Sequence, residues 1–175
     1  MAWPQNPQPA PAPQPAGGQP ISLGALVTAG AAVLTFLFSF VRIYKVDERG
    51  FDAGWSVWTT DFAPGLFGVG TLIPFLALVA GAAALARAFV PGLDRKEVGG
   101  FSLLQVQVVA ALFAVVLWLG YLISIVFAGS GQLGTDFKLG LGMLLLFLGL
   151  AGVVAGTVLS MAEDRKAGAG PSPAT

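Results

Sequence analysis

The sequence predicts an all-helical integral membrane protein with four transmembrane helices in an antiparallel up-down bundle. The chain is 55% apolar and only 10% charged, with a mean hydropathy of +0.80. A soluble domain carries about 25% charged residues. The nine basic and nine acidic residues cluster between long uncharged runs, which is typical of a chain that crosses a membrane several times.

Four apolar segments are each close to the roughly 20 residues that cross a hydrocarbon core. They cover residues 21–43, 66–90, 103–127 and 139–161. Charged residues stand only at their ends, and a charge at the centre of a span would cost about 2.5–3.5 kcal/mol. Because every backbone polar group must be paired without water at that depth, these segments are expected to be helices.

The flanking segments have a different composition. Residues 1–20 are rich in Pro, Gln and Ala and carry no charge, so we expect a disordered tail with polyproline II character. Residues 21–162 form the predicted transmembrane domain, and residues 163–175 form a short tail that we also expect to be disordered.

The predicted connections are short, which makes consecutive helices antiparallel neighbours. The loop at 44–65 is the longest, and the segments 91–100 and 129–137 are expected to be turns. Ser102 can cap the third helix. Four spans put both termini on one side of the membrane.

The distribution of basic residues favours cytoplasmic termini in a plasma membrane. Five basic residues lie on the side of the termini and four on the other. The first group is Arg87, Arg95, Lys96, Arg165 and Lys166, and the second is Arg42, Lys45, Arg49 and Lys138.

Small residues recur at steps of three or four in two of the segments, which lets helix backbones approach closely. This pattern favours packing within the bundle, and the alternative is a face for homo-oligomerisation. The residues are Gly24, Thr28 and Ala32 in the first segment and Gly149, Gly152 and Gly156 in the fourth.

Pro74 lies inside the second segment, where a proline is expected to kink the helix. Gln105 and Gln107 are the strongly polar side chains of the third segment. A structural kink and an interhelical or headgroup hydrogen bond are the readings we favour. Pro74 and both glutamines facing one interior cavity would instead indicate a small transporter or channel subunit.

The composition argues against catalysis. The chain has no Cys and no His, which excludes thiolate nucleophiles, disulfides and Cys/His zinc sites. We therefore predict no enzyme activity, no cofactor and no metal site. A net charge of zero offers no field for nucleic acid, so none is expected as a partner.

The loop at 44–65 contains an unusual group of aromatic residues, Phe51, Trp55, Trp58 and Phe62. Their spacing of four, three and four would fit a helix on the membrane surface. The stretch "WSVWTT" is rich in strand formers, which favours an extended or hairpin segment over the mouth of the bundle. These rings are predicted to anchor the loop in the headgroup layer, and a contact surface for a partner is the alternative.

The layout resembles small four-pass membrane proteins of actinobacteria, including the mycobacterial four-pass antigen-type family of the cell envelope. The tail "PQNPQPAPAPQPAGGQP" and the segment "AAVLTFLFSF" leading into a polar aromatic loop carry the resemblance, followed by three Ala/Gly/Leu-rich spans. The C-terminal tail "EDRKAGAGPSPAT" is short where those relatives carry long low-complexity tails. The resemblance implies a non-enzymatic envelope or division-associated protein.

Together these observations predict a non-catalytic interaction or scaffold component of the cell envelope or division machinery. The alternative is a small transporter or channel subunit. The expected partners are the lipid bilayer and membrane or cytoplasmic proteins, bound through the N-terminal tail or through the loop at 44–65.

Overall fold

The computed structural model describes residues 22–48, 51–59, 64–90, 93, 97–132 and 137–168. The predicted N-terminal tail at 1–20, the residue Phe62 and the segment 169–175 lie outside these ranges. Four helices dominate the fold: α1 (Leu23–Phe38), α2 (Pro64–Phe89), α3 (Leu103–Gln132) and α4 (Leu141–Gly168).

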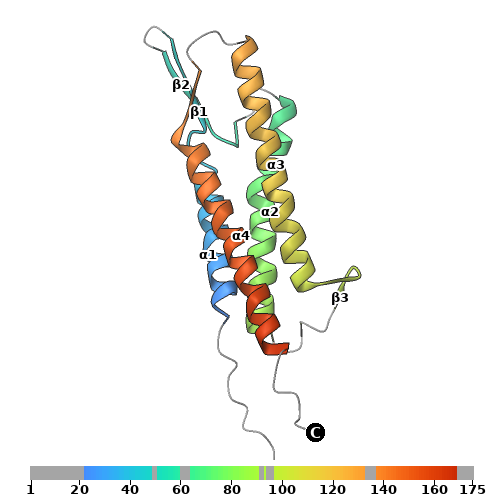
Figure 1. Ribbon diagram of the computed structural model, residues 1–175. Helices are drawn as coiled ribbons and strands as arrows, with labels where there is room; N and C mark the ends of the chain where they lie inside the picture. Colours follow the sequence, from blue (N-terminus) through green and yellow to red (C-terminus); the bar gives the residue numbers. More distant parts are fainter. Residues whose placement is uncertain are drawn as a thin grey trace, which may run out of the picture.

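The membrane character of the helices is confirmed in its general form. Three helical segments are long and apolar enough to cross a membrane: Val69–Phe89, Leu103–Phe127 and Leu141–Lys166. The helix α1 is also apolar but shorter. It packs between α4 and α2, and α2 packs in turn on α3, whereas α3 and α4 share fewer contacts (Figure 1).

The first helix is shorter than the sequence predicts. Its 16 residues span about 24 Å, less than the roughly 30 Å of a hydrocarbon core. The helix stops because Ser39 caps it: the Ser39 hydroxyl donates to the Phe36 carbonyl at 2.5 Å. The chain then turns, and Ile43 already pairs with a strand through its N–H, which donates to the Trp55 carbonyl at 2.8 Å.

Besides the four helices, the fold contains a small sheet. The strands are β1 (Tyr44–Glu48), β2 (Phe51–Trp55) and β5 (Phe137–Leu139), in the order β2-β1-β5 with antiparallel neighbours. The hairpin of β1 and β2 agrees with the favoured extended reading of the aromatic loop. The strand β5 was not predicted, because its three residues lie where the predicted turn at 129–137 ends and the fourth predicted span begins at residue 139.

A second, smaller hairpin lies between α2 and α3, where the sequence predicts only a turn. It pairs β3 (Glu97–Val98) with β4 (Phe101–Ser102). Gly99 and Gly100 form its two-residue turn with φ of 63° and 84°, a conformation that hairpin turns require and glycine adopts without strain. As expected, Ser102 caps α3: its hydroxyl accepts from the Gln105 N–H at 3.2 Å.

The two ends of the bundle differ. The end where α1 begins and α4 finishes, here the terminal end, carries the β3–β4 hairpin (Figure 1). The opposite end, here the sheet end, carries β1, β2 and β5. The helix α4 continues through Gly168, although the sequence predicts a disordered tail from residue 163.

The sheet is attached firmly to the helices. Ile43, Tyr44 and Val57 are at most 2% exposed and belong to the hydrophobic core. The Gly140 N–H donates to the Ile43 carbonyl at 2.7 Å, which joins the start of α4 to the hairpin. The base of the sheet therefore occupies the core next to α2 and α3 beyond the point where the short α1 ends.

The small residues of α1 and α4 meet along one antiparallel seam. A Cβ atom built on Gly156 would lie 2.5 Å from the Thr28 backbone nitrogen, and one on Gly152 would lie 2.8 Å from the Ala31 Cβ. Gly24 faces Ser160 and Gly149 faces Thr35 in the same way. Ala32 instead contacts Gly81 of α2. These glycines therefore serve contacts between helices of one chain.

Pro74 is fully buried inside α2, which continues from Pro64 to Phe89. Because proline has no N–H, the Gly70 carbonyl one turn earlier has no helical donor. Gly70 itself is closely packed: a Cβ there would lie 3.0 Å from the Tyr121 ring and 3.1 Å from Val57.

Candidate functional site

The sheet end gathers aromatic side chains from the hairpin and from the helices. Trp55 is the last residue of β2 and is the register partner of Tyr44 on β1. Their rings stack with centroids 5.0 Å apart. Phe51 begins β2 opposite Glu48. The anchoring group predicted from the sequence is thus split between a stacked pair on the sheet and a separate cluster around Trp58.

Trp58 lies at the centre of a four-ring cluster that joins the loop to α1 and α2. Its ring stacks on Phe40 at 5.2 Å and meets Phe36 and Phe75 edge to face at 6.0 and 5.8 Å. Its Nε1 donates to the Ser39 hydroxyl at 2.8 Å. Phe40 and Phe75 are about half exposed, at 56% and 51%, so the cluster presents an aromatic patch on the outer surface of α1 and α2.

We expect Trp58→Ala to lower the free energy of unfolding by about 1–2 kcal/mol, because three ring contacts are lost at a partly exposed site. Trp58→Phe keeps an aromatic ring in the cluster and loses the indole N–H and part of the ring area, so its cost should be smaller, about 1 kcal/mol. Chemical unfolding in detergent micelles measures both. The control is Phe113→Ala, which removes a ring on α3 that is 53% exposed and lies outside this cluster, and an equal loss there would contradict the role of the cluster.

Tyr44 is buried beneath the hairpin, and this burial raises the pKa of its phenol above the usual value, with a smaller contribution from Tyr121. The folded protein therefore favours the neutral phenol. Its stabilising effect is complete below the ordinary tyrosine pKa of about 10. It is lost as the pH rises from there through the higher pKa of the folded state.

The chain has two tyrosines, so the Tyr121→Phe variant reports on Tyr44 alone. We expect tyrosinate absorbance in the folded variant to appear only well above pH 10, and to appear near pH 10 after denaturation. A folded variant that titrates at the ordinary value would show that Tyr44 is open to solvent.

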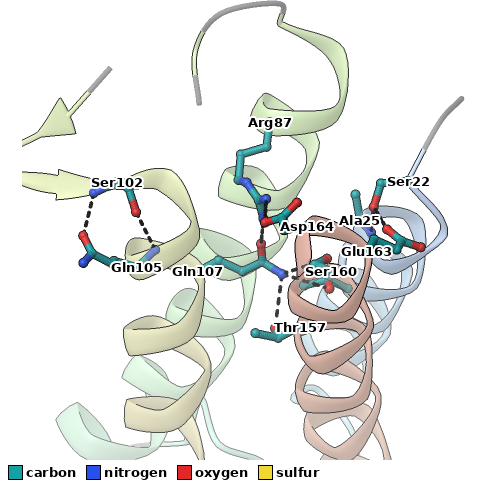
Figure 2. A network of polar contacts seen from close by, with 11 residues as sticks. Ser22, Ala25, Arg87, Ser102, Gln105, Gln107, Thr157, Ser160, Glu163 and Asp164 are labelled. Carbon is teal, nitrogen blue, oxygen red and sulfur yellow. Dashed lines mark hydrogen bonds and ion pairs between the residues drawn. The ribbon is translucent and has the colours of Figure 1, made fainter. Parts of the chain in front are cut away.

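The terminal end carries a polar network that links all four helices (Figure 2). Gln107 of α3 is fully buried, and its amide nitrogen lies 3.3 Å from the hydroxyls of Thr28 and Thr157 and 3.5 Å from that of Ser160. Both threonine hydroxyls donate to carbonyls of their own helices at 2.8 Å. Their oxygens are therefore left to accept from Gln107.

The charged residues of this network complete the link. Arg87 of α2 donates to the Gln107 side-chain oxygen at 3.2 Å and forms an ion pair with Asp164 of α4. Glu163 accepts from the Ser22 hydroxyl and, at 3.2 Å, from the Gly24 N–H. A carboxylate at the start of α1 is favourable because it meets the positive end of the helix dipole.

These roles of Arg87, Glu163 and Asp164 were not predicted. The two carboxylates bind residues that are distant along the chain: Gly24 lies 139 positions from Glu163, and Arg87 lies 77 positions from Asp164. The signal that could have found them is the position of Glu163 and Asp164 within one helical turn of the Gly156–Ser160 stripe.

The two glutamines lie in different environments. Gln107 is enclosed among four helices, whereas Gln105 is exposed and its side-chain oxygen accepts from the Ser102 N–H at 2.8 Å. Pro74 lies on α2 thirteen residues before Arg87, about 20 Å along the axis. The three residues named for a transporter therefore do not line one cavity.

Within the described ranges, no group of three or more His, Cys, Asp or Glu residues is placed to hold a metal ion. The described residues form an aromatic surface at the sheet end and a hydrogen-bonded network at the terminal end. Comparison with protein-family models, with curated proteins and with solved structures finds no match to this chain.

Proposed function

We propose that the chain is a non-catalytic interaction or scaffold protein of the plasma membrane, acting in the cell envelope or division machinery. In this proposal α1 is the fourth span, the termini are cytoplasmic, and the sheet lies on the outer side. The excess of basic residues at the terminal end supports this orientation. The resemblance in layout to four-pass envelope proteins supports a role in the cell envelope or in division.

The observation that carries the proposal is the attachment of the sheet to the bundle. A simple connecting loop does not need buried residues, yet Ile43 and Tyr44 belong to the core. Three backbone hydrogen bonds of 2.7–2.9 Å also join residues 42 and 43 to β2 and to the start of α4. A surface held in one conformation loses little entropy when a partner binds. Trp55 is partly exposed and stacks on the buried Tyr44, so its ring is held in place as aromatic interface anchors are.

The proposal is tested by photo-cross-linking in the native membrane from a photoreactive amino acid at Ser56. We expect a defined envelope protein to be captured from this position. The same probe at Leu119, which is 45% exposed in mid-helix, is the control and should capture lipid.

A variant with a shortened hairpin tests whether the hairpin binds a partner without disturbing the fold of the bundle. Replacing residues 47–52 by an Asn-Gly turn keeps the pairs Tyr44↔Trp55 and Val46↔Ala53. This variant should fold normally and lose the protein cross-link. Unchanged capture by the shortened hairpin, or capture only through the N-terminal tail, would contradict a recognition role for the sheet.

A further inference from the structure

The outer face of α1 is apolar along its whole length. The helix packs on α4 and α2, and the large exposed side chains on its remaining face are Leu23, Leu26, Val33, Leu34, Leu37 and, just beyond the helix, Phe40. The 16 residues of α1 span about 24 Å, whereas the hydrocarbon core of a typical bilayer is roughly 30 Å thick. The apolar surface that α1 offers to lipid is therefore too short for such a bilayer.

Polar groups close this apolar face at both ends. At the terminal end, the Ser22 hydroxyl donates to a carboxylate of α4. At the sheet end, the Trp58 indole N–H donates to the Ser39 hydroxyl at 2.8 Å. The loop around Trp58 is partly exposed and turns sharply, with the Thr59 N–H donating to the Ser56 carbonyl at 3.2 Å. Irregular backbone is not found facing hydrocarbon and tryptophan favours the headgroup layer, so we expect the headgroups to reach the level of Trp58.

The helix α3 offers a longer apolar surface at the opposite corner of the bundle. It packs chiefly on α2, whereas α1 packs on α4 and α2. The span Leu103–Phe127 has 25 residues and a length of about 37 Å. Large apolar side chains stay exposed up to its sheet end: Leu119, Ile123, Val126 and Phe127. Lipid beside α3 therefore meets an apolar surface longer than the usual hydrocarbon core.

Contacts between the elements place both surfaces on one scale. A Cβ atom on Gly70 of α2 would lie 3.0 Å from the Tyr121 ring of α3, so these two residues share a level. Trp58 meets Phe75 with ring centroids 5.8 Å apart, and Phe75 follows Gly70 by about 7 Å toward the terminal end. Phe127 lies about 9 Å beyond Tyr121 in the other direction. The apolar surface of α3 therefore extends roughly 10–15 Å beyond the level of Trp58.

Tilting the bundle would not remove this difference. At the terminal end, Gln107 of α3 is joined to Thr28 of α1 and to Arg87 of α2, so the polar boundary is level across these helices (Figure 2). A tilt that lowers α3 at the sheet end would raise α1 and carry Ser22 and Thr28 into hydrocarbon. The adjustment is therefore left to the bilayer, which can change its thickness locally.

Given the proposed crossing of the membrane by α1, on which this inference rests, we propose that the protein thins the bilayer along α1, in the leaflet on the sheet side. The lipids that fit this face are phospholipids with short acyl chains. They cover α1 fully, whereas longer chains must compress there, which is unfavourable. The half-exposed rings of Phe40 and Phe75 beside Trp58 form the aromatic belt of this lowered headgroup layer.

Depth-dependent quenching of tryptophan fluorescence tests the thinning. The full-length chain is placed in dioleoylphosphatidylcholine bilayers that contain phospholipid brominated either near the headgroup or near the chain ends. One reporter is the native Trp58. The matched reporter is Leu119→Trp with Trp58→Phe, because Leu119 is 45% exposed and lies within one turn of Tyr121. The other tryptophans of the chain are replaced in both variants, as Trp3→Phe, Trp55→Phe and Trp118→Phe.

We expect bromine near the headgroup to quench Trp58 at least about two-fold more than bromine near the chain ends, and the reverse order for Leu119→Trp. Best quenching of both near the chain ends would place the Trp58 loop inside an unthinned bilayer. Best quenching of both near the headgroup would place the end of α3 outside the membrane. Either result would overturn the proposal. The comparison involves no partner, so it can fail while cross-linking from Ser56 succeeds.

Spin labelling repeats the depth comparison with all the native tryptophans in place. The chain has no cysteine, so Phe40→Cys and Leu119→Cys each carry a single nitroxide. We expect the label at Phe40, which is 56% exposed, to be relaxed mainly by a water-soluble nickel complex. The label at Leu119 should be relaxed mainly by oxygen, which concentrates in hydrocarbon. Equal depths for the two labels would contradict a thinned bilayer at α1.

The preference for short chains is measured in bilayers that mix dimyristoleoyl- and dierucoylphosphatidylcholine, with bromine on one lipid at a time. Quenching of each reporter is scaled to its value in the pure brominated lipid. We expect the short-chain lipid to be enriched at Trp58 at least about two-fold relative to Leu119→Trp. The same lipid mixture at both reporters would contradict the selection of short chains.

Discussion

Gly156→Val is expected to separate α1 from α4 and to lower the free energy of unfolding by about 3 kcal/mol. A Cβ atom on Gly156 would lie 2.5 Å from the Thr28 nitrogen and hydroxyl and 2.9 Å from its Cα. These are mainly backbone atoms, which cannot move aside as a flexible side chain can. The steric clash is relieved only if α1 and α4 move apart, which loosens their close packing.

Unfolding of the protein in detergent micelles measures this effect, and Gly30→Val is the matched control. Gly30 is on the same helix pair, yet a Cβ built there meets no atom within 4 Å. Valine at this position should change stability by less than about 0.5 kcal/mol. Equal losses in both variants would show that valine weakens these helices by itself and that the seam is not close-packed.

Gln107→Ala is expected to lower the free energy of unfolding by about 2 kcal/mol, from the cavity and the lost hydrogen bonds together. The amide joins Arg87 of α2 to Thr28 and Thr157 of the other helices. Gln107→Met fills a similar volume but forms no such hydrogen bonds. The stability difference between the Met and Ala variants therefore measures the contribution of packing, and the difference between the native chain and the Met variant measures that of the hydrogen bonds.

Gln105→Ala is the matched control, two residues away on the same helix. It removes an exposed capping contact with Ser102, which is typically worth about 1 kcal/mol or less. Unfolding measured by circular dichroism in micelles should rank Gln107→Ala as clearly more damaging. The reverse order would show that the buried network adds nothing to the association of the helices.

The helices could be predicted from the sequence because an uncharged apolar run of about 20 residues is long enough to cross the hydrocarbon core, where its backbone must pair within a helix. The starts of α3 and α4 agree with the predicted spans within two residues. The end of α1 could not be read from hydropathy, because Phe40, Val41 and Ile43 beyond it are still apolar. Its end depends on Ser39 and on Trp58, which approaches from a loop 19 residues later.

The sheet shows a second reason why part of the fold could not be predicted from the sequence. The β1–β2 hairpin is local, but the strand formers of "WSVWTT" that predict an extended segment share only Trp55 with it. The third strand pairs residues about 90 positions apart, and its three residues carry too little pattern to identify a partner. The same reason applies to Glu163 on Ser22, a contact across 141 positions. Long-range polar pairs are set by how the helices assemble.

The central claim is that the short α1 crosses the membrane as a fourth span, so that the sheet lies opposite to both termini. The chain has no cysteine, so single substitutions report topology directly. Ala10→Cys, Ser56→Cys and Ala169→Cys are labelled in intact cells with an impermeant maleimide, and again after permeabilisation. The account predicts labelling of Ser56→Cys in intact cells and of the other two variants only after permeabilisation. Opposite behaviour of Ala10→Cys and Ala169→Cys would contradict it, because the chain would then cross the membrane an odd number of times.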